Sequence, residues 1–157
     1  MGYANRLTID LAEKCDFGSR YTQLCQDYSE FLIGTSNRIV DSEIIESTLN
    51  QFEYPYRYFK NEKFYRVYLL KNHNYEAWFH FQLYANSGSI DGYIDAMVYI
   101  RENKKHLAGG VFSALRKEVE HDSFVLRPLY TADVLPEILK KLIDIAVSYV
   151  NAFEKVR

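Results

Sequence analysis

Residues 75–84 read YEAWFHFQLY and residues 90–101 read IDGYIDAMVYIR. In the first segment alanine, phenylalanine and leucine stand at odd positions, and in the second isoleucine, alanine and valine stand at even positions. Because successive side chains of a strand point to opposite faces, each segment is predicted to be a strand with one buried face. The apolar side chains of both strands face the same core only if each odd-numbered residue of the first strand pairs with an even-numbered residue of the second, so that the two numbers add to an odd sum. This condition predicts a hairpin whose loop is residues 86–89.

The predicted register also sets which side chains meet across this hairpin. Phe81 is expected opposite Ile94 on the core face, and His80 opposite Asp95 on the other face. A histidine beside a carboxylate is the oriented base of many hydrolases, but such a base also needs a nucleophile or a water site. No serine, cysteine or threonine falls on that face in this register, so we interpret the pair as a sheet-stabilising contact.

The segment Phe64–Leu70 is predicted to be the strand before this hairpin. Its apolar side chains face the core only if the numbers of paired residues in this strand and the next add to an even sum. This places Val67 opposite Ala77 on the core face. The same register places Arg66 opposite Trp78 on the other face. There the guanidinium is expected to stack on the indole as a cation–π pair.

The aromatic segment Tyr54–Lys60 is predicted to be extended and to form a further strand. A two-residue turn at Asn61-Glu62 would bring Arg57 opposite Arg66, and two like charges directly opposite each other destabilise a strand pair. The sequence therefore favours either a longer loop or a shifted register, and leaves both open.

Helical periodicity predicts three elements outside the strands. Apolar side chains recur at spacings of three and four over Ser19–Ile33, Ser42–Phe52 and Asp133–Glu154. The first is expected to begin with Ser19 as its cap and to end at Gly34. The last is long enough to cross the whole meander, and we expect it to cover the core face of the sheet.

Three stretches have weaker patterns. Residues 1–18 fit either a strand or a helix, because short apolar runs are not resolved by periodicity. Residues 102–106 are predicted to be a charged loop, followed by a short helix that Gly109 and Gly110 open. Residues 124–126 are predicted to form a fifth strand that ends before Pro128.

These elements predict one α+β domain over residues 1–157: a four- or five-stranded antiparallel meander, with N-terminal helices and a long C-terminal helix packed on it. A length of 157 residues suits a single domain. The 48% hydrophobic content suits an ordinary globular core.

Charge and motifs exclude several classes of function. A formal charge of −2 provides no basis for nucleic-acid or anionic-membrane binding. Cys15 and Cys25 lack the spacing of a zinc or redox site, and no two histidines share a metal-ligand spacing. We therefore expect no metal, no cofactor and no catalysis. Free thiols and the absence of a long apolar run favour a cytoplasmic protein.

The acidic residues concentrate in the first third of the chain. Nine acidic and four basic side chains lie within residues 1–53. Asp41, Glu43 and Glu46 gather at the start of the second predicted helix, where the helix dipole favours anions. Solvated helix faces explain such charge, but a partner protein with a basic surface would also fit it.

The non-core face of the meander is unusually aromatic. Its side chains are Tyr68, Trp78, His80, Tyr84, Tyr93, Met97 and Tyr99, with Asp95 at the rim. An exposed patch of this kind is typical of a protein contact surface. The sequence also allows the N-terminal helices to cover it as a second core.

The sequence thus favours a non-catalytic protein-binding module of bacterial type, such as an immunity protein that inhibits a partner toxin. This expectation rests on size, on the absence of catalytic motifs and on the aromatic face. Two alternatives remain: a chaperone for a secreted protein, and a small enzyme or ligand-binding domain that holds His80 and Asp95 in a pocket. Oligomeric state is left open.

Overall fold

The structure, a computed structural model, describes residues 6–29, 42–84, 87–100 and 103–156. Its strands follow one another in the chain between two groups of helices. The elements in order are α1 (Arg6–Lys14), α2 (Phe17–Asp27), α4 (Ser42–Leu49), β1 (Tyr56–Phe59), β2 (Phe64–Lys71), β3 (Tyr75–Tyr84), β4 (Ser89–Ile100), β5 (Asn103–Val111), α5 (Phe112–Glu120) and α6 (Leu135–Val156).

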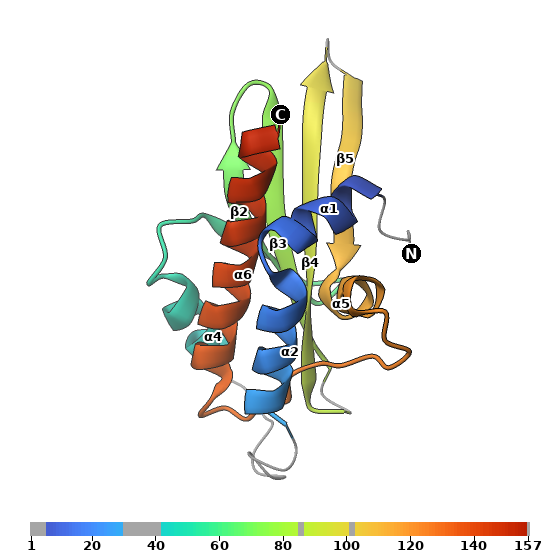
Figure 1. The fold of residues 1–157 in the computed structure, drawn as a ribbon. Coiled ribbons are helices and arrows are strands. Elements are labelled where there is room, and N and C mark those ends of the chain that lie inside the picture. Colours follow the sequence, from blue (N-terminus) through green and yellow to red (C-terminus); the bar gives the residue numbers. More distant parts are fainter. Residues whose placement is uncertain (1–5, 30–41, 85–86, 101–102, 157) are drawn as a thin grey trace.

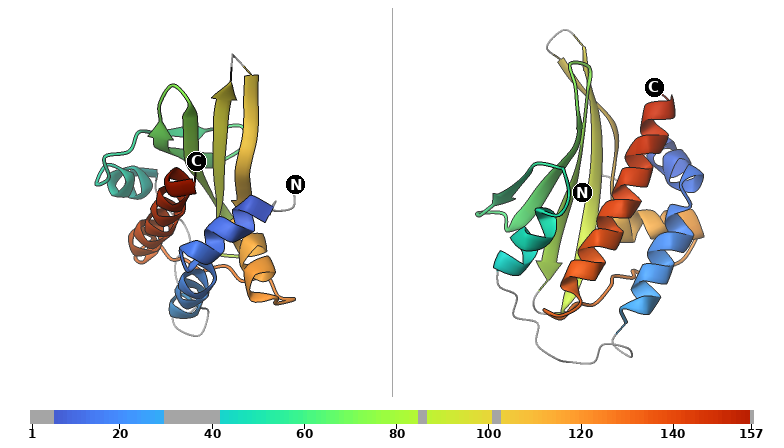
Figure 2. Two further views of the ribbon diagram at one scale, coloured as in Figure 1. Left: turned by 45° about the horizontal axis from the view of Figure 1, so that its top comes forward. Right: turned by 90° about the vertical axis from the view of Figure 1, so that its left-hand side faces the viewer.

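The strands form one antiparallel sheet in the order β1-β2-β3-β4-β5. The helices lie against one face of this sheet, with α6 crossing it (Figure 1). Seen from the side, the opposite face carries no described helix (Figure 2). One core joins residues from every described helix to the inward side chains of the sheet. The predicted α+β architecture is therefore confirmed.

In the β3–β4 hairpin the apolar side chains of both strands share the core face, as predicted, but the pairing register differs from the predicted one. Phe79, and not Phe81, lies opposite Ile94, so each pair is shifted by two residues. The loop is correspondingly earlier, because Ser89 already belongs to β4. The start of β4 also binds the segment before α6, where the amide of Ile90 donates to the carbonyl of Pro128 at 3.1 Å. A shift of two keeps every side chain on its face, so alternation could not exclude it.

The β2–β3 pair shows the same kind of difference. Val67 lies opposite Phe79 instead of Ala77, although both partners belong to the predicted core face. Arg66 lies opposite His80, and Tyr68 takes the place opposite Trp78. A bulge after Tyr68 then changes the register for the rest of the strand, and a bulge has no signature in a simple alternation.

The β1–β2 hairpin adopts the register that the sequence disfavoured. Arg57 lies directly opposite Arg66, and Lys63 closes the turn with a left-handed φ of 58°. The expectation that the chain would avoid this like-charge pair is wrong. The aromatic surroundings of the two guanidinium groups, described below, are what the pairwise charge rule did not include.

The fifth strand comes from a different segment than predicted. Residues 103–111 form β5, where a charged loop was expected, and Gly109 and Gly110 belong to this strand. The short helix predicted after the two glycines is present as α5, which begins at Phe112. The amide of Gly109 donates to Oγ1 of Thr8 at 3.0 Å, so α1 covers part of this sheet edge. The charged residues 103–106 are exposed on the same edge, where lysine discourages pairing with another strand.

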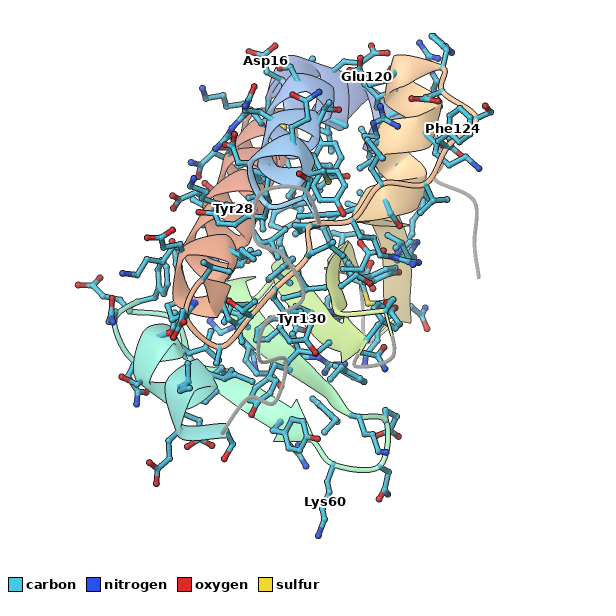
Figure 3. The ribbon with its side chains drawn as sticks, turned by 90° about the horizontal axis from the view of Figure 1, so that it is seen from below. Asp16, Tyr28, Lys60, Glu120, Phe124 and Tyr130 are labelled. Atoms are coloured by element: carbon cyan, nitrogen blue, oxygen red, sulfur yellow. The ribbon has the colours of Figure 1, made fainter. Side chains whose placement is uncertain are left out.

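Residues 124–126, predicted to be a strand, form part of the irregular segment that follows α5. Phe124 is 72% exposed and Val125 is 50% exposed. Phe124 lies at the outer side of this segment, near Glu120 at the end of α5 (Figure 3). Without a neighbouring strand, the β-favouring side chains of this segment are not enough to form one.

The helices confirm the stronger predictions and resolve the ambiguous one. Residues 6–14 form a helix, and α2 begins at Phe17 after Asp16, which adopts a left-handed φ of 55°. The predicted cap at Ser19 is therefore two residues inside the helix. The predicted end of this helix, at Ile33 and Gly34, lies outside the described residues.

Asp91 ties the sheet to the helices. Its carboxylate is 4% exposed and accepts hydrogen bonds from the amide of Ser113 in the first turn of α5 at 3.2 Å, from Nε of Arg127 at 2.9 Å and from the hydroxyl of Tyr21 in α2 at 3.4 Å. The amide of Gly92 donates to it as well, at 2.9 Å. One buried charge therefore joins β4, α2, α5 and the segment before α6.

Replacing Asp91 with alanine is expected to lower the free energy of unfolding by about 3–5 kcal/mol, because Arg127 and the first turn of α5 lose their buried anionic partner. Urea unfolding at neutral pH measures this change. Asp10→Ala is the matched control, since the ion pair of Asp10 with Arg6 is exposed and its loss should cost about 0.5 kcal/mol or less. Equal effects of the two substitutions would contradict the role of Asp91.

Candidate functional site

The helix-free face of the sheet is the candidate functional site, and we call it the open face. Alternation along each strand and the observed register assign its side chains. From β1 to β5 they include Arg57, Phe59, Phe64, Arg66, Tyr68, Glu76, Trp78, His80, Gln82, Tyr84, Tyr93, Asp95, Met97, Tyr99, Lys104 and His106.

Every sheet residue that the sequence analysis selected as a contact residue lies on this face: Tyr68, Trp78, His80, Tyr84, Tyr93, Asp95 and Tyr99. The sequence left open whether the N-terminal helices cover them. In the structure those helices pack on the opposite face, where their apolar residues join the common core. The open face therefore carries no helical cover within the described part of the chain.

The predicted acidic contact residues do not share this surface. Glu43 and Glu46 are exposed on α4, whose buried side chains Ile45 and Leu49 belong to the core on the helix side of the sheet. Asp41 lies outside the described residues. The predicted set is thus divided between two sides of the sheet, and one flat partner cannot contact both.

Arg66 is the centre of the open face. Its guanidinium carbon lies 5.0 Å from the centre of the Trp78 ring and 4.7 Å from that of Phe59. The predicted cation–π contact with Trp78 is confirmed, although the two residues are diagonal neighbours and not direct partners. Trp78 is consequently only 8% exposed, so it supports the surface from below.

His80 is held by Arg66 in its neutral form. Nε of Arg66 donates to Nε2 of His80 at 2.8 Å, so this ring nitrogen must carry a lone pair. Burial of the ring, together with the neighbouring charge of Arg66, lowers the pKa of His80 to about 4. The lone pair of Nε2, with which His80 would act as a base, is therefore already engaged by Arg66.

The predicted pairing of His80 with Asp95 is wrong. The two-residue shift brings Tyr93 opposite His80 and Trp78 opposite Asp95. Asp95 instead forms an ion pair with His106 of β5. Its pKa is raised by burial, and the contact with His106 partly offsets that increase. The partner of Asp95 was missed because residues 103–106 have no alternation that would mark them as a strand.

A shallow pocket of about 160 Å³ lies on the open face between Phe64, His80, Tyr84 and Tyr93. The carboxylate of Asp91 also lines it, but its oxygens are engaged by Ser113, Arg127 and Gly92. Among the described residues no cluster of histidine, cysteine, aspartate and glutamate is suited to hold a metal ion. The pocket offers aromatic contact area and no assembled catalytic group.

No protein-family model, curated protein or solved structure matches this chain. None of the helices in the described ranges is both long and apolar enough to cross a bilayer. The chemistry of the open face is therefore the basis on which a function is proposed.

Three residues around Arg66 on the open face were not selected as contact residues from the sequence: Arg57, Phe59 and Phe64. Phe64 stacks on His80 with ring centres 4.6 Å apart, and Phe59 stacks on Phe64 at 4.8 Å. The structure has the longer loop that the sequence left open, at residues 60–63, but in the register of the two-residue turn. That register could have found these residues, but the Arg57–Arg66 pair argued against it.

The pKa of His80 predicts a dependence of stability on pH. Its folded-state value of about 4 lies below the ordinary value of 6.5, so the unfolded chain binds the proton more readily between these values. The contribution of His80 is complete above about pH 7 and is lost as the pH falls from 6.5 towards 4. Because the ring is only half-buried, we expect a loss of about 1–2 kcal/mol.

His80→Gln isolates this effect, since the glutamine amide oxygen can still accept from Arg66 but does not titrate in this range. The difference in unfolding free energy between wild type and variant should shrink from pH 7 to pH 4.5, as measured in urea. A difference that stays constant would show that His80 is not held neutral.

Proposed function

We propose that this chain is a non-catalytic protein-binding module that contacts its partner with the open face. The observation that carries the proposal is a sheet whose described helices all lie on one side, with a fixed aromatic surface on the other. Tyr68, Tyr84, Tyr93 and Tyr99 are half-buried there, so each presents part of its ring or hydroxyl to a partner. Tyrosines of this kind, set in a polar rim, are enriched in protein interfaces.

The state of the polar groups supports binding in preference to catalysis. The base nitrogen of His80 accepts from Arg66, and Asp95 is paired with His106. Glu76 accepts the hydroxyl of Tyr99. A general base or nucleophile must be free to exchange a proton with substrate, whereas a contact surface gains from groups held in one arrangement before binding.

Within this class, we propose a dedicated inhibitor of bacterial type that blocks the working surface of a toxin. Small size and a preorganised face suit such a role, because little conformational entropy is lost when the complex forms. A partner with a basic surface is the corresponding proposal for Glu43 and Glu46 on α4. Since α4 lies on the other side of the sheet, the two contact surfaces make separable predictions.

The test begins with capture of a partner from the native host, followed by purification of that protein and measurement of its affinity for variants. The double substitution Tyr68→Ala with Tyr99→Ala is expected to weaken the complex at least 30-fold, the loss typical of contact residues that dominate binding. Phe124→Ala is the matched control, because it removes an exposed aromatic ring away from the open face. Its affinity should stay within about twofold.

The double charge reversal Glu43→Lys with Glu46→Lys tests the second surface. A strong loss of affinity in this variant, with none in the tyrosine variant, would place the contact on α4 and refute the open face as the binding surface. Thermal unfolding of each variant verifies that it remains folded.

A further inference from the structure

We propose that the β1–β2 hairpin, residues 56–71, binds a carboxylate-bearing segment of the partner protein, with Arg57 and Arg66 as its paired anion-binding groups. This inference rests on the proposed function, since it names the chemistry that the partner presents to the open face. It differs from the basic partner expected from the acidic residues of α4.

The two guanidinium groups lie against the same aromatic ring. Arg57 and Arg66 are direct partners across β1 and β2. Their guanidinium carbons lie 4.9 and 4.7 Å from the centre of the same Phe59 ring. Like charges in this position destabilise a strand pair, and a bound carboxylate would offset that cost.

No described acidic side chain forms an ion pair with Arg57 or Arg66, although the charge of Arg66 acts at a distance to lower the pKa of Asp95, which burial raises overall. The ion pairs within the described ranges join Arg6 to Asp10, Asp95 to His106, Arg116 to Asp122 and Asp91 to Arg127. Asp95 and Glu76, the acids of the neighbouring strands on this face, are engaged by His106 and Tyr99. Arg57 and Arg66 thus retain their positive charge towards a partner.

Arg66 is also fixed in orientation. Phe59 and Trp78 contact its guanidinium, and His80 accepts from its Nε. Among the described residues no hydrogen bond engages its two terminal nitrogens, which form the planar fork that matches a carboxylate. Because the group is already immobilised and half-desolvated, binding an anion costs less side-chain entropy than it would at a mobile lysine.

The charge of the hairpin selects the occupant. Residues 56–71 contain five basic side chains and one acidic side chain, so their formal charge is +4 in a chain whose formal charge is −2. The basic residues are Arg57, Lys60, Lys63, Arg66 and Lys71. Lys60 projects from the tip of the hairpin, away from the helices (Figure 3). This local positive surface complements an acidic peptide segment.

The basic surface is confined to one hairpin, which favours a protein over a nucleic acid. A nucleic-acid backbone would continue across the open face past Glu76 and Asp95, where its phosphates would meet negative charge. A short acidic segment of a protein can end its contacts at β2.

The test uses a capped glutamate-rich peptide, Gly-Glu-Glu-Gly-Glu, at low ionic strength. Trp78 is the only tryptophan of the chain and contacts Arg66, so its fluorescence reports binding directly. Saturable binding is expected, and Arg57→Gln should weaken it about tenfold. Arg66→Lys, which keeps the charge and loses the fork, should weaken it by a similar factor.

Lys140→Gln is the matched control, because it removes one exposed positive charge from α6, outside the hairpin. Its affinity should stay within about twofold. An equal loss in this variant would reduce the site to diffuse charge attraction and overturn the proposal. The glutamine analogue of the peptide should not bind.

Three other results would also overturn it: no saturable binding of the glutamate peptide, equally tight binding of inorganic phosphate, and tighter binding of a single-stranded oligonucleotide. A dimer of the chain that is lost in Arg57→Gln and in Glu43→Lys would identify the occupant as a second copy, again against the proposal. Sedimentation of the free protein distinguishes this case.

The outcome is separable from the proposed function. If the peptide fails to bind while the tyrosine variant still loses the captured partner, the open face remains the contact surface and only its anion site is refuted. If the peptide binds while the captured partner binds the tyrosine variant as tightly as the wild type, the anion site remains and the proposed contact surface is refuted.

Discussion

Asp91 is the constraint on which the arrangement of the helices depends. A buried carboxylate is stable only when charges or hydrogen-bond donors surround it, and here those donors come from α2, from the start of α5 and from Arg127. The start of α5 and the segment before α6 are therefore both held beside the end of β4 that carries Asp91. From there the apolar side chains of α5 and α6 pack into the core on one face of the sheet.

The open face is the consequence of that arrangement. With no described helix to bury them, its aromatic side chains pack on one another and on Arg66. A charged group thus supplies the contact that a second layer of helices would otherwise provide. The result is a surface whose rings and polar groups are fixed by neighbouring side chains, with their remaining area directed to solvent.

The electrostatic character of the two sides differs. Exposed glutamates lie on α4, whereas the β1–β2 hairpin concentrates positive charge in a chain that is weakly acidic overall. Net charge alone would assign the protein a basic partner. The positions of the charges instead suit two separate proposals, a basic partner at α4 and an acidic segment at the hairpin, because attraction at a protein contact depends on charges within about one Debye length of it.

The sequence by itself determined the periodicities: which segments are strands or long helices, and which side chains of β2, β3 and β4 share a face. Alternation repeats every two residues, so it could not distinguish His80 opposite Asp95 from His80 opposite Tyr93. Only the tertiary structure decided that register, through the contacts of Ser89 and Ile90 with the segment before α6. It also formed β5 from a stretch without alternation, because an edge strand takes its hydrogen bonds from a neighbour. The pairing of Arg57 with Arg66 is tertiary for the same reason: pairwise charge opposes it, and surrounding aromatic rings that no local pattern reveals make it stable.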